Sequence, residues 1–225
     1  MRKQFKAAQI AAATLCMLLL SFSSSAEPPN LARLTEEITT YHDSGTYDKE
    51  LDDIILEAKS YILQAAANNK QSADPKKLAI VLDIDETSIS NYNKMVKRHF
   101  IGLSEQIHRE ILEANSPAIP ATLALYKAVT KAGVKVFFVT GRHLSETKAT
   151  RLNLLRAGFD NWEGLYLRPD DYPFPSIIPF KSSTRERITQ DGYWIVASIG
   201  DQCSDLVGGF AEKGFKLPNP FYYLP

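Results

Sequence analysis

KLAIVLDIDETS, residues 77–88, joins a run of five apolar residues to a group of acidic ones. The apolar run, Leu78 to Leu82, is typical of a strand that is buried on both faces of a sheet. The acidic residues that follow are Asp83, Asp85 and Glu86. Since ligands of open α/β sheets bind just outside the carboxyl ends of the strands, this stretch predicts a functional site at the end of a central strand.

The spacing of the acids indicates the chemistry of that site. Asp83 and Asp85 carry like charges close together, and a bound divalent cation would relieve their repulsion. Mg²⁺ takes oxygen ligands and commonly needs one or two carboxylates together with a substrate phosphate. A carboxylate can also act as a nucleophile and form an aspartyl-phosphate. The stretch therefore predicts metal-assisted phosphoryl transfer, and the alternative is that the acids only cap the following helix.

The first 26 residues have the layout of a secretory signal peptide. Three basic residues precede a mostly apolar run from Ala7 to Leu20, and Ser24, Ser25 and Ala26 offer small residues for cleavage. The apolar run is shorter than the roughly 20 residues that span a bilayer, so we expect cleavage rather than a stable membrane anchor. The sequence thus predicts a periplasmic or secreted protein.

The composition is that of an ordinary globular protein without a strong charge. The chain has 225 residues, of which 44% are hydrophobic and 23% are charged. Loss of residues 1–26 would remove three of 26 basic side chains and none of 26 acidic ones, leaving a formal charge of −3. This balance argues against a nucleic acid polymer as a partner. Cys203 would then be the remaining cysteine, so no internal disulfide is expected.

The rest of the chain reads as an alternation of helices and strands. Residues 30–42 and 47–69, separated by Gly45, are expected to be two helices of an N-terminal helical appendage at 27–75. From residue 76 onward the alternation predicts a mostly parallel sheet with helices on both faces. Further helices are expected at 119–132, 145–156 and 181–190, and further strands at 134–139, 165–167, 194–199 and 215–217.

Residues 89–118 are expected to form a small, partly helical cap near the carboxyl edge of the sheet. Tyr92 and Phe100 are candidates for the walls of a substrate pocket, because aromatic faces suit planar ligand groups. The alternative is that both rings form the small core of the cap itself.

Polar residues recur where other expected strands end. Thr140, Gly141 and Arg142 follow the second strand, and a hydroxyl followed by glycine and backbone N–H groups suits a phosphate. Asp201 and Asp205 follow the fourth strand, and one helical turn would bring both carboxylates toward a hard cation. All of these groups can meet at one edge of a parallel sheet.

Two further residues near this edge need an explanation. Lys181 stands at the start of an expected helix, where a positive charge opposes the helix dipole. This indicates that the charge is needed for an anion, although a surface lysine is the alternative. Cys203 lies between the two aspartates of the fourth strand end and is expected to be a small packing residue.

The order of these motifs resembles the haloacid dehalogenase (HAD) superfamily of phosphatases. DIDET, VTGR, a lysine before a helix, and GDQCSD follow one another along the chain. The ending KLPNPFYYLP is especially similar to the class B-type, plant-like acid phosphatases of subfamily IIIB. The resemblance covers about residues 76–225 and implies an α/β, HAD-like (Rossmann-like) phosphatase core. The segments that resemble the subfamily are 81–87, 140–142, 153–168, 181–187 and 200–225.

The resemblance implies catalytic and substrate-binding roles. Asp83 would be the nucleophile, and Asp85 the general acid and then the general base. Thr140, with Gly141 and Arg142, would bind the transferring phosphoryl group. Lys181 would neutralise charge on that group and on Asp83. Since the acid must hold its proton when the leaving group departs, the pKa of Asp85 is expected to be raised.

The resemblance also implies Mg²⁺ as cofactor. Asp83 and Asp201 would be ligands, Asp205 would support or join them, and the backbone carbonyl of Asp85 would face the ion. The predicted function is an exported phosphomonoesterase that acts on small phosphomonoesters, with nucleotides among the candidates.

Two other functions stay open, and so does homo-oligomerisation. Some plant relatives are storage proteins that have lost the nucleophile, and the presence of Asp83 argues against that reading. The other alternative is a phosphotransferase that passes the phosphoryl group to an alcohol.

Overall fold

The computed structural model describes residues 28–224, and the expected signal peptide lies outside the described residues. Residues 28–34 belong to a separate compact unit, and the fold described below is that of the unit from Thr35 onward. Helix α2 (Leu31–Asp43) is followed by helix α3 (Thr46–Lys70). Gly45, between them, has a φ of 81°, which glycine adopts without strain. Among the described residues, no helix is long and apolar enough to cross a membrane.

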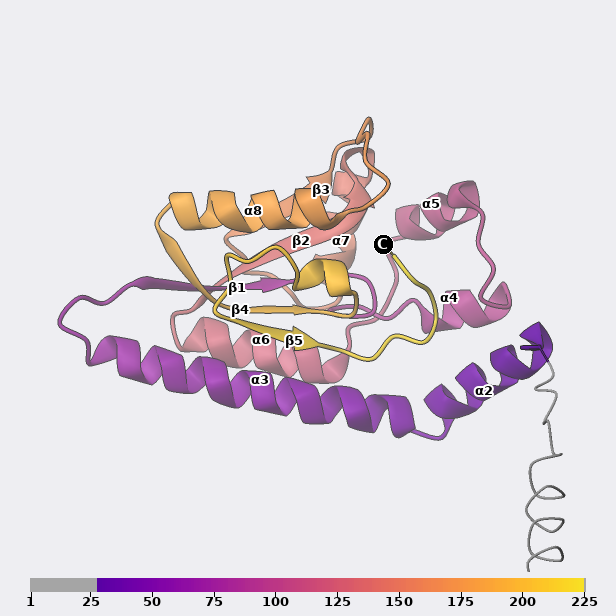
Figure 1. Ribbon diagram of the computed structural model, residues 1–225, viewed down its shortest axis with the longest axis horizontal. Coiled ribbons are helices and arrows are strands. Elements are labelled where there is room, and N and C mark those ends of the chain that lie inside the picture. The colour runs from indigo at the N-terminus through magenta and orange to yellow at the C-terminus, as the bar shows by residue number, and fades with distance from the viewer. Residues whose placement is uncertain (1–27, 225) are drawn as a thin grey trace, which may run out of the picture. The chain divides into compact units, whose positions relative to one another are not determined.

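A five-stranded parallel sheet in the order β3-β2-β1-β4-β5 forms the centre of the fold (Figure 1). The expected α/β class with a parallel sheet is therefore confirmed. The KLAIVL stretch forms β1, which lies in the middle of the sheet between β2 and β4. The strands are β1 (Lys77–Leu82), β2 (Lys135–His143), β3 (Gly164–Arg168), β4 (Tyr193–Gly200) and β5 (Lys213–Lys216).

The burial of β1 explains why its sequence is continuously apolar. Its alternate residues Ile80 and Leu82 belong to the large hydrophobic core on one face of the sheet. Ala79 and Val81 belong to a smaller core on the other face, which Ile188 also joins. Because side chains alternate between the faces of a strand, both sets must be apolar when helices cover both faces.

Helices cover both faces of the sheet (Figure 1). Helix α3 packs against α6 (Pro120–Lys131), and α7 (Thr147–Arg156) contributes Leu154 to the same large core. Helix α8 (Ile178–Gln190) lies on the opposite face, where it contributes Ile188. The buried stripe of α3 thus belongs to the core of the sheet. The residues of this stripe are Tyr47, Leu51, Ile55, Ala58, Ile62 and Ala66. The expected division of the chain into domains at residue 75 stays a prediction.

Residues 89–118 hold two short helices, α4 (Tyr92–Lys97) and α5 (Ser104–Leu112). Aromatic rings pack together beneath them. The ring centroids of Phe100 and Phe221 are 5.9 Å apart, and those of Tyr92 and Phe221 are 5.5 Å apart. His42 stacks on Tyr92. The cap is therefore tied by aromatic contacts to α2 and to the C-terminal tail, residues 217–224.

The boundaries of several elements differ from expectation. Strand β2 continues to His143 instead of ending at 139. A 3₁₀ turn, η1 (Leu144–Glu146), precedes α7, and α8 begins at Ile178 rather than at 181. Cys203 is exposed, so the expectation that it is a packing residue was wrong. Its side chain lies in a short turn where the neighbouring polar residues take the buried positions.

Candidate active site

The carboxyl ends of β1 and β2 open into a cavity of about 830 Å³. The helices of the cap and the C-terminal tail complete its wall. Asp201 and Asp205 follow β4 and lie in contact with this region through Lys181 and Asp83. The sheet thus brings together nearly all the polar residues that the sequence singled out. Those that line the cavity are Asp83, Asp85, Thr140, Gly141, Arg142 and Lys181.

Asp83, Asp201 and Asp205 form a buried cluster of carboxylates. One oxygen of each lies within 4.8 Å of the others, and the side chains are 5%, 1% and 3% exposed. The Nζ atom of Lys181 is 2.8 Å from Asp83 Oδ1 and also donates to Asp205. Three carboxylates and one ammonium leave a formal charge of −2. An oxygen-only donor set with this charge fits a hard divalent cation such as Mg²⁺.

The pKa values reflect the crowding of these charges. Burial raises the pKa of Asp83 well above its ordinary value, although Lys181 acts to lower it. Burial likewise raises the pKa of Asp205, again against the effect of Lys181. Burial tends to lower the pKa of Lys181, but the two carboxylates raise it above its ordinary value, so the ammonium stays charged. The three carboxylates of the cluster therefore repel one another, and a bound cation would relieve this repulsion.

Asp201 is fixed by residues from three parts of the chain. Thr87 Oγ1 donates to Asp201 Oδ1 at 3.0 Å. Gln202 and Asn219 donate to Asp201 Oδ2 at 2.7 and 2.5 Å. Sequence reasoning gave Thr87 no firm role and did not single out Asn219, since a lone asparagine in a proline-rich tail has no recognisable pattern.

A tight turn after β4 places Asp205. The 3₁₀ turn η2 (Cys203–Asp205) brings Asp205 Oδ2 within 2.8 Å of the backbone N–H of Gln202. A Cβ atom at Gly200 would lie 2.2 Å from Asp205 Cγ, so no side chain fits there. The predicted helical turn that brings Asp201 and Asp205 together is present, and glycine at residue 200 makes it possible.

Arg185 anchors the loop that follows η2. This fully buried residue of α8 donates to the carbonyls of Gly209 and Asp205 at 2.9 Å each, and also to that of Val207. Arg185→Lys is expected to lower the free energy of unfolding by about 2–4 kcal/mol, because one ammonium cannot satisfy three buried carbonyls. Chemical denaturation measures this change.

The matched control is Arg187→Lys on the same helix. Arg187 is exposed, and its guanidinium lies over the ring of Tyr166. This variant is expected to stay within about 0.5 kcal/mol of the wild type. Equal stability of the two variants would contradict the anchoring role of Arg185.

Asp85 is held by a guanidinium rather than by the carboxylate cluster. Arg142 donates to it through Nε at 2.9 Å and Nη2 at 2.6 Å, and Asn91 Nδ2 donates at 2.8 Å. Burial acts to raise the pKa of Asp85, but the charge and hydrogen bonds of Arg142 lower it below its ordinary value. The expected raised pKa of Asp85 was therefore wrong, because a bidentate ion pair outweighs burial.

The end of β2 explains how Arg142 reaches Asp85. Thr140 pairs with Leu167 and His143 with Arg168, so two residues of β2, at 141 and 142, have no partner in β3. Such a bulge redirects side chains at the end of a strand.

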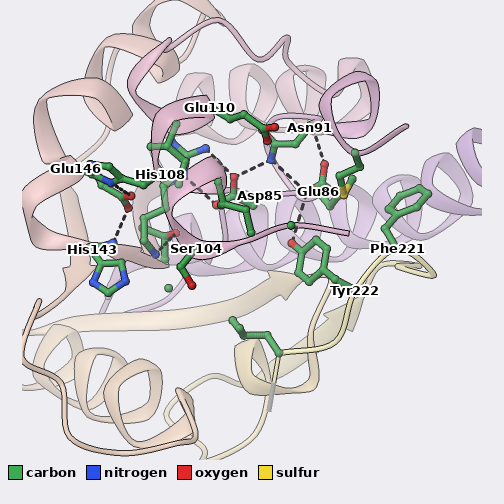
Figure 2. Close-up of a pocket in the computed structure, with 18 of the residues that line it drawn as sticks. Asp85, Glu86, Asn91, Ser104, His108, Glu110, His143, Glu146, Phe221 and Tyr222 are labelled. Atoms are coloured by element: carbon green, nitrogen blue, oxygen red, sulfur yellow. Dashed lines mark hydrogen bonds and ion pairs between the residues drawn. The ribbon is translucent and has the colours of Figure 1, made fainter. Parts of the chain in front are cut away.

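The cavity wall contains residues that sequence reasoning missed. Figure 2 shows Tyr222 of the tail pointing toward Glu86, with Asp85 and Asn91 beside them. The Tyr222 hydroxyl donates to Glu86 Oε2 at 3.4 Å, and the backbone N–H of Asn91 donates to Glu86 Oε1 at 2.5 Å. Burial, followed by the charge of Asp85, raises the pKa of Glu86 to about 8. Glu86 thus links the β1 end to the cap and the tail.

The two aromatic residues expected in the pocket wall have different positions. Phe100 lines the cavity, and Tyr92 is not among the residues that line it. The hydroxyl of Tyr92 donates to Asp43 at 2.8 Å, and its ring stacks on His42. The position of Tyr92 matches the alternative reading, in which it packs within the cap.

Several known proteins are similar to this chain in sequence. The stem 28 kDa glycoprotein of Glycine max is 39% identical over 151 residues, which are 64% of this chain and 59% of that protein. Acid phosphatase 1 of Solanum lycopersicum is 34% identical over 79% of this chain and 69% of that protein. Vegetative storage protein 1 of Arabidopsis thaliana is 29% identical over 78% of this chain and 69% of that protein. The chain thus spans only 59% of the length of the stem glycoprotein that it matches.

A solved structure shows the fold of this chain, and a family description shows its family. The class C acid phosphatase from Bacillus anthracis superposes with a TM-score of 0.64 over 84% of this chain and 86% of that one. At 23% identity, this likeness shows the fold alone. The family described as "HAD superfamily, subfamily IIIB (Acid phosphatase)" matches residues 5–225. The chain therefore belongs to subfamily IIIB of the HAD superfamily, the acid phosphatase family.

Proposed function

We propose that this chain is an exported, Mg²⁺-dependent phosphomonoesterase that acts through an aspartyl-phosphate on Asp83. The observation that carries the proposal is the position of Asp83. Its carboxylate lies at the end of the central strand, lines the large cavity and contacts Lys181, within 4.8 Å of two further carboxylates. Phosphoryl transfer depends mainly on positioning and charge neutralisation, and these residues supply both.

The metal would be held by Asp83, Asp201 and Asp205. When bound, Mg²⁺ would withdraw charge from the phosphoryl oxygens and relieve the repulsion among the three carboxylates. The hydrogen bonds from Thr87, Gln202 and Asn219 keep Asp201 oriented for this role.

The residues of the chain would carry out the transfer in two steps. In the first, an Asp83 oxygen attacks phosphorus, the bond from phosphorus to the leaving oxygen breaks, and the Asp85 carboxyl gives that oxygen a proton. In the second, water attacks the aspartyl-phosphate and Asp85 takes its proton. Thr140 and Lys181 would hold the phosphoryl oxygens. Since Arg142 keeps Asp85 ionised, this ion pair has to open and Asp85 has to take up a proton from water before it can act as the acid of the first step.

The substrate would be a small phosphomonoester. The cavity holds about 830 Å³, which is in the size range of small-molecule sites. Phe100 and Phe221 line it with parallel rings whose centroids are 5.9 Å apart. A planar group such as a nucleobase could lie against these rings, so nucleotides are within the proposed class.

Removal of the metal is expected to abolish activity and to lower stability. Residues 27–225 should release phosphate from an aryl phosphate with Mg²⁺ between pH 4 and 8, and release should stop with a chelator. The melting temperature should rise with Mg²⁺. The free energy of unfolding should increase by up to about 3 kcal/mol when Mg²⁺ is present at a hundredfold excess over its Kd. Ca²⁺ at the same concentration separates a specific effect from ionic strength. Equal activity with and without chelator would contradict the proposed metal dependence.

A non-catalytic binding or storage role is the second candidate. It is favoured by the relative that is named a vegetative storage protein. Folded protein that binds inorganic phosphate with Mg²⁺ but releases none from any phosphomonoester would support this role and overturn the proposed one. A phosphotransferase would instead yield more phosphorylated alcohol than free phosphate when an alcohol is added.

A further inference from the structure

Arg168 is a cationic residue in the cavity wall that the reaction described above does not use. It is the last residue of β3, and its backbone pairs with His143 at the end of β2. Its side chain lines the same cavity as Asp83 and Lys181. The guanidinium of Arg168 therefore faces the space in which a substrate would lie.

The other buried cations of the cavity already have anionic partners. Arg142 is paired with Asp85, Lys181 with Asp83 and Asp205, and Arg98 with Glu110. Among residues 28–224, no carboxylate oxygen lies within 4.0 Å of an Arg168 nitrogen. The Nε atom of Arg168 is buried and has no hydrogen-bond partner. A buried donor without a partner is costly, and an incoming anion would satisfy it.

The groups around Arg168 leave its charge available. Arg168 Nη2 donates to His143 Nε2 at 2.6 Å, so this imidazole nitrogen acts as an acceptor. Asp170 is the nearest exposed acid on the same side, but its carboxylate accepts from the backbone N–H and hydroxyl of Ser145 at 3.1 and 2.8 Å. Asp170 still interacts electrostatically with Arg168, but neither neighbour places a carboxylate oxygen within 4.0 Å of an Arg168 nitrogen.

Glu146, a buried acid on this side of the cavity, already has hydrogen-bond partners. Figure 2 shows Glu146 between His108 and His143, on the opposite side of Asp85 from Tyr222. Glu146 Oε1 lies 2.7 Å from His108 Nδ1, and Oε2 accepts from the backbone N–H of His143 at 2.7 Å. Both carboxylate oxygens of Glu146 are therefore engaged by other groups, and neither is paired with Arg168.

The backbone of β2 gives the scale of the distance from this point to the phosphoryl site. Thr140, which would hold the transferring phosphoryl group, is three residues from His143, and Arg168 pairs with His143. Three residues of strand span at most about 10 Å. Two anionic groups on one small molecule can bridge such a distance.

We propose that Arg168 is the centre of a second anion subsite, so that the preferred substrates are phosphomonoesters with a second phosphate or carboxylate about 10 Å from the scissile phosphate. The substrate preference rests on the proposed phosphatase function, whereas the anion subsite can be tested by ligand binding alone. Arg168 would determine specificity and would not take part in bond breaking.

The test compares hexane-1,6-diol bisphosphate and 6-(phosphooxy)hexanoate with 6-hydroxyhexyl phosphate, which differs only in lacking the second charge. Calorimetry on the Asp83→Asn variant with Mg²⁺ gives each Kd without turnover. At least one of the two ligands with a second anionic group is expected to bind about tenfold more tightly than the hydroxyl analogue. The ligand with the lower Kd shows whether the subsite prefers phosphate or carboxylate.

Substitution of Arg168 identifies the source of the preference. In the Asp83→Asn background, Arg168→Met should bring the Kd ratio close to one, and Arg168→Lys should restore part of it. Arg151→Met is the matched control, because Arg151 lies over the ring of Trp162 and is not among the residues that line the cavity. This control should keep the full ratio.

The outcomes separate the subsite from the proposed function. Equal Kd values for all three ligands would overturn the subsite, whether or not the wild type hydrolyses them. A preference that survives Arg168→Met would also overturn it. A preference that is lost in Arg168→Met, in a protein whose wild type releases no phosphate, would establish the subsite and overturn the phosphatase.

Discussion

Asp83→Asn is expected to reduce phosphate release by at least about 10⁴-fold, because the variant lacks the carboxylate that we propose as the nucleophile. The fold should remain intact. Burial raises the pKa of Asp83 well above its ordinary value, so the charged carboxylate is costly at this position and a neutral group is tolerated there. Asparagine supplies a neutral group of nearly the same shape. Phosphate release with Mg²⁺ and the melting temperature in chelator are the two measurements.

Asp160→Asn is the matched control for this prediction. Asp160 is exposed and is not among the residues that line the cavity. The control should retain full turnover and stability. Activity of Asp83→Asn within tenfold of the wild type would refute the nucleophile assignment, and a melting temperature well below that of the wild type would refute the account of its burial.

The sequence predicted the centre of the site well because the signal there is local. An apolar run followed at once by acids marks the end of a buried parallel strand, and the structure places Asp83 there with Asp201 and Asp205. The unfavourable position of Lys181 at a helix start indicated an anionic partner. Lys181 does contact two carboxylates, although α8 begins three residues earlier than expected.

The rest of the site depends on contacts that periodicity does not reveal. The pairing of Arg142 with Asp85 follows from the two-residue bulge in β2, and sequence patterns do not report a bulge. Asn219 and Tyr222 reach the site from an irregular tail, where neither helical nor strand spacing applies. Arg168 is an ordinary strand-end residue in the sequence, and what distinguishes it in the described part of the chain is a buried Nε without a hydrogen-bond partner.

These observations share one physical cause. The site concentrates charge where water is scarce, and each buried charge needs a partner. Asp85 has Arg142, Asp83 has Lys181, and Glu146 has hydrogen bonds with His108 and the backbone of His143. Glu86 forms no ion pair in the part of the chain that the structure describes, but burial raises its pKa to about 8 and so favours its neutral form. Among the other described residues of the site, two groups remain without full compensation: the carboxylate cluster, which has a formal charge of −2, and Arg168. They are the places where a cation and a second anion are expected to bind, so the incomplete pairing indicates ligands of opposite sign at two points of one cavity.

Lys181→Met tests this account most directly. The Lys181 side chain is 2% exposed and is the only cation within ion-pair distance of the Asp83 and Asp205 carboxylates among residues 28–224. Its removal leaves three buried carboxylates uncompensated, so the free energy of unfolding in chelator at pH 7 should fall by about 3–5 kcal/mol. Phosphate release should fall by about 10²–10³-fold or more, because the charge on the phosphoryl group is no longer neutralised.

Mg²⁺ should stabilise Lys181→Met more than it stabilises the wild type, since the charge that faces the cation changes from −2 to −3. Chemical denaturation with and without Mg²⁺ measures this difference in both proteins. Lys127→Met is the matched control, because Lys127 is exposed on α6 and forms no ion pair within the described part of the chain, and it should behave as the wild type does. If Lys181→Met loses less than about 1 kcal/mol in chelator, the carboxylates do not depend on this ammonium and the electrostatic account of the cluster is wrong.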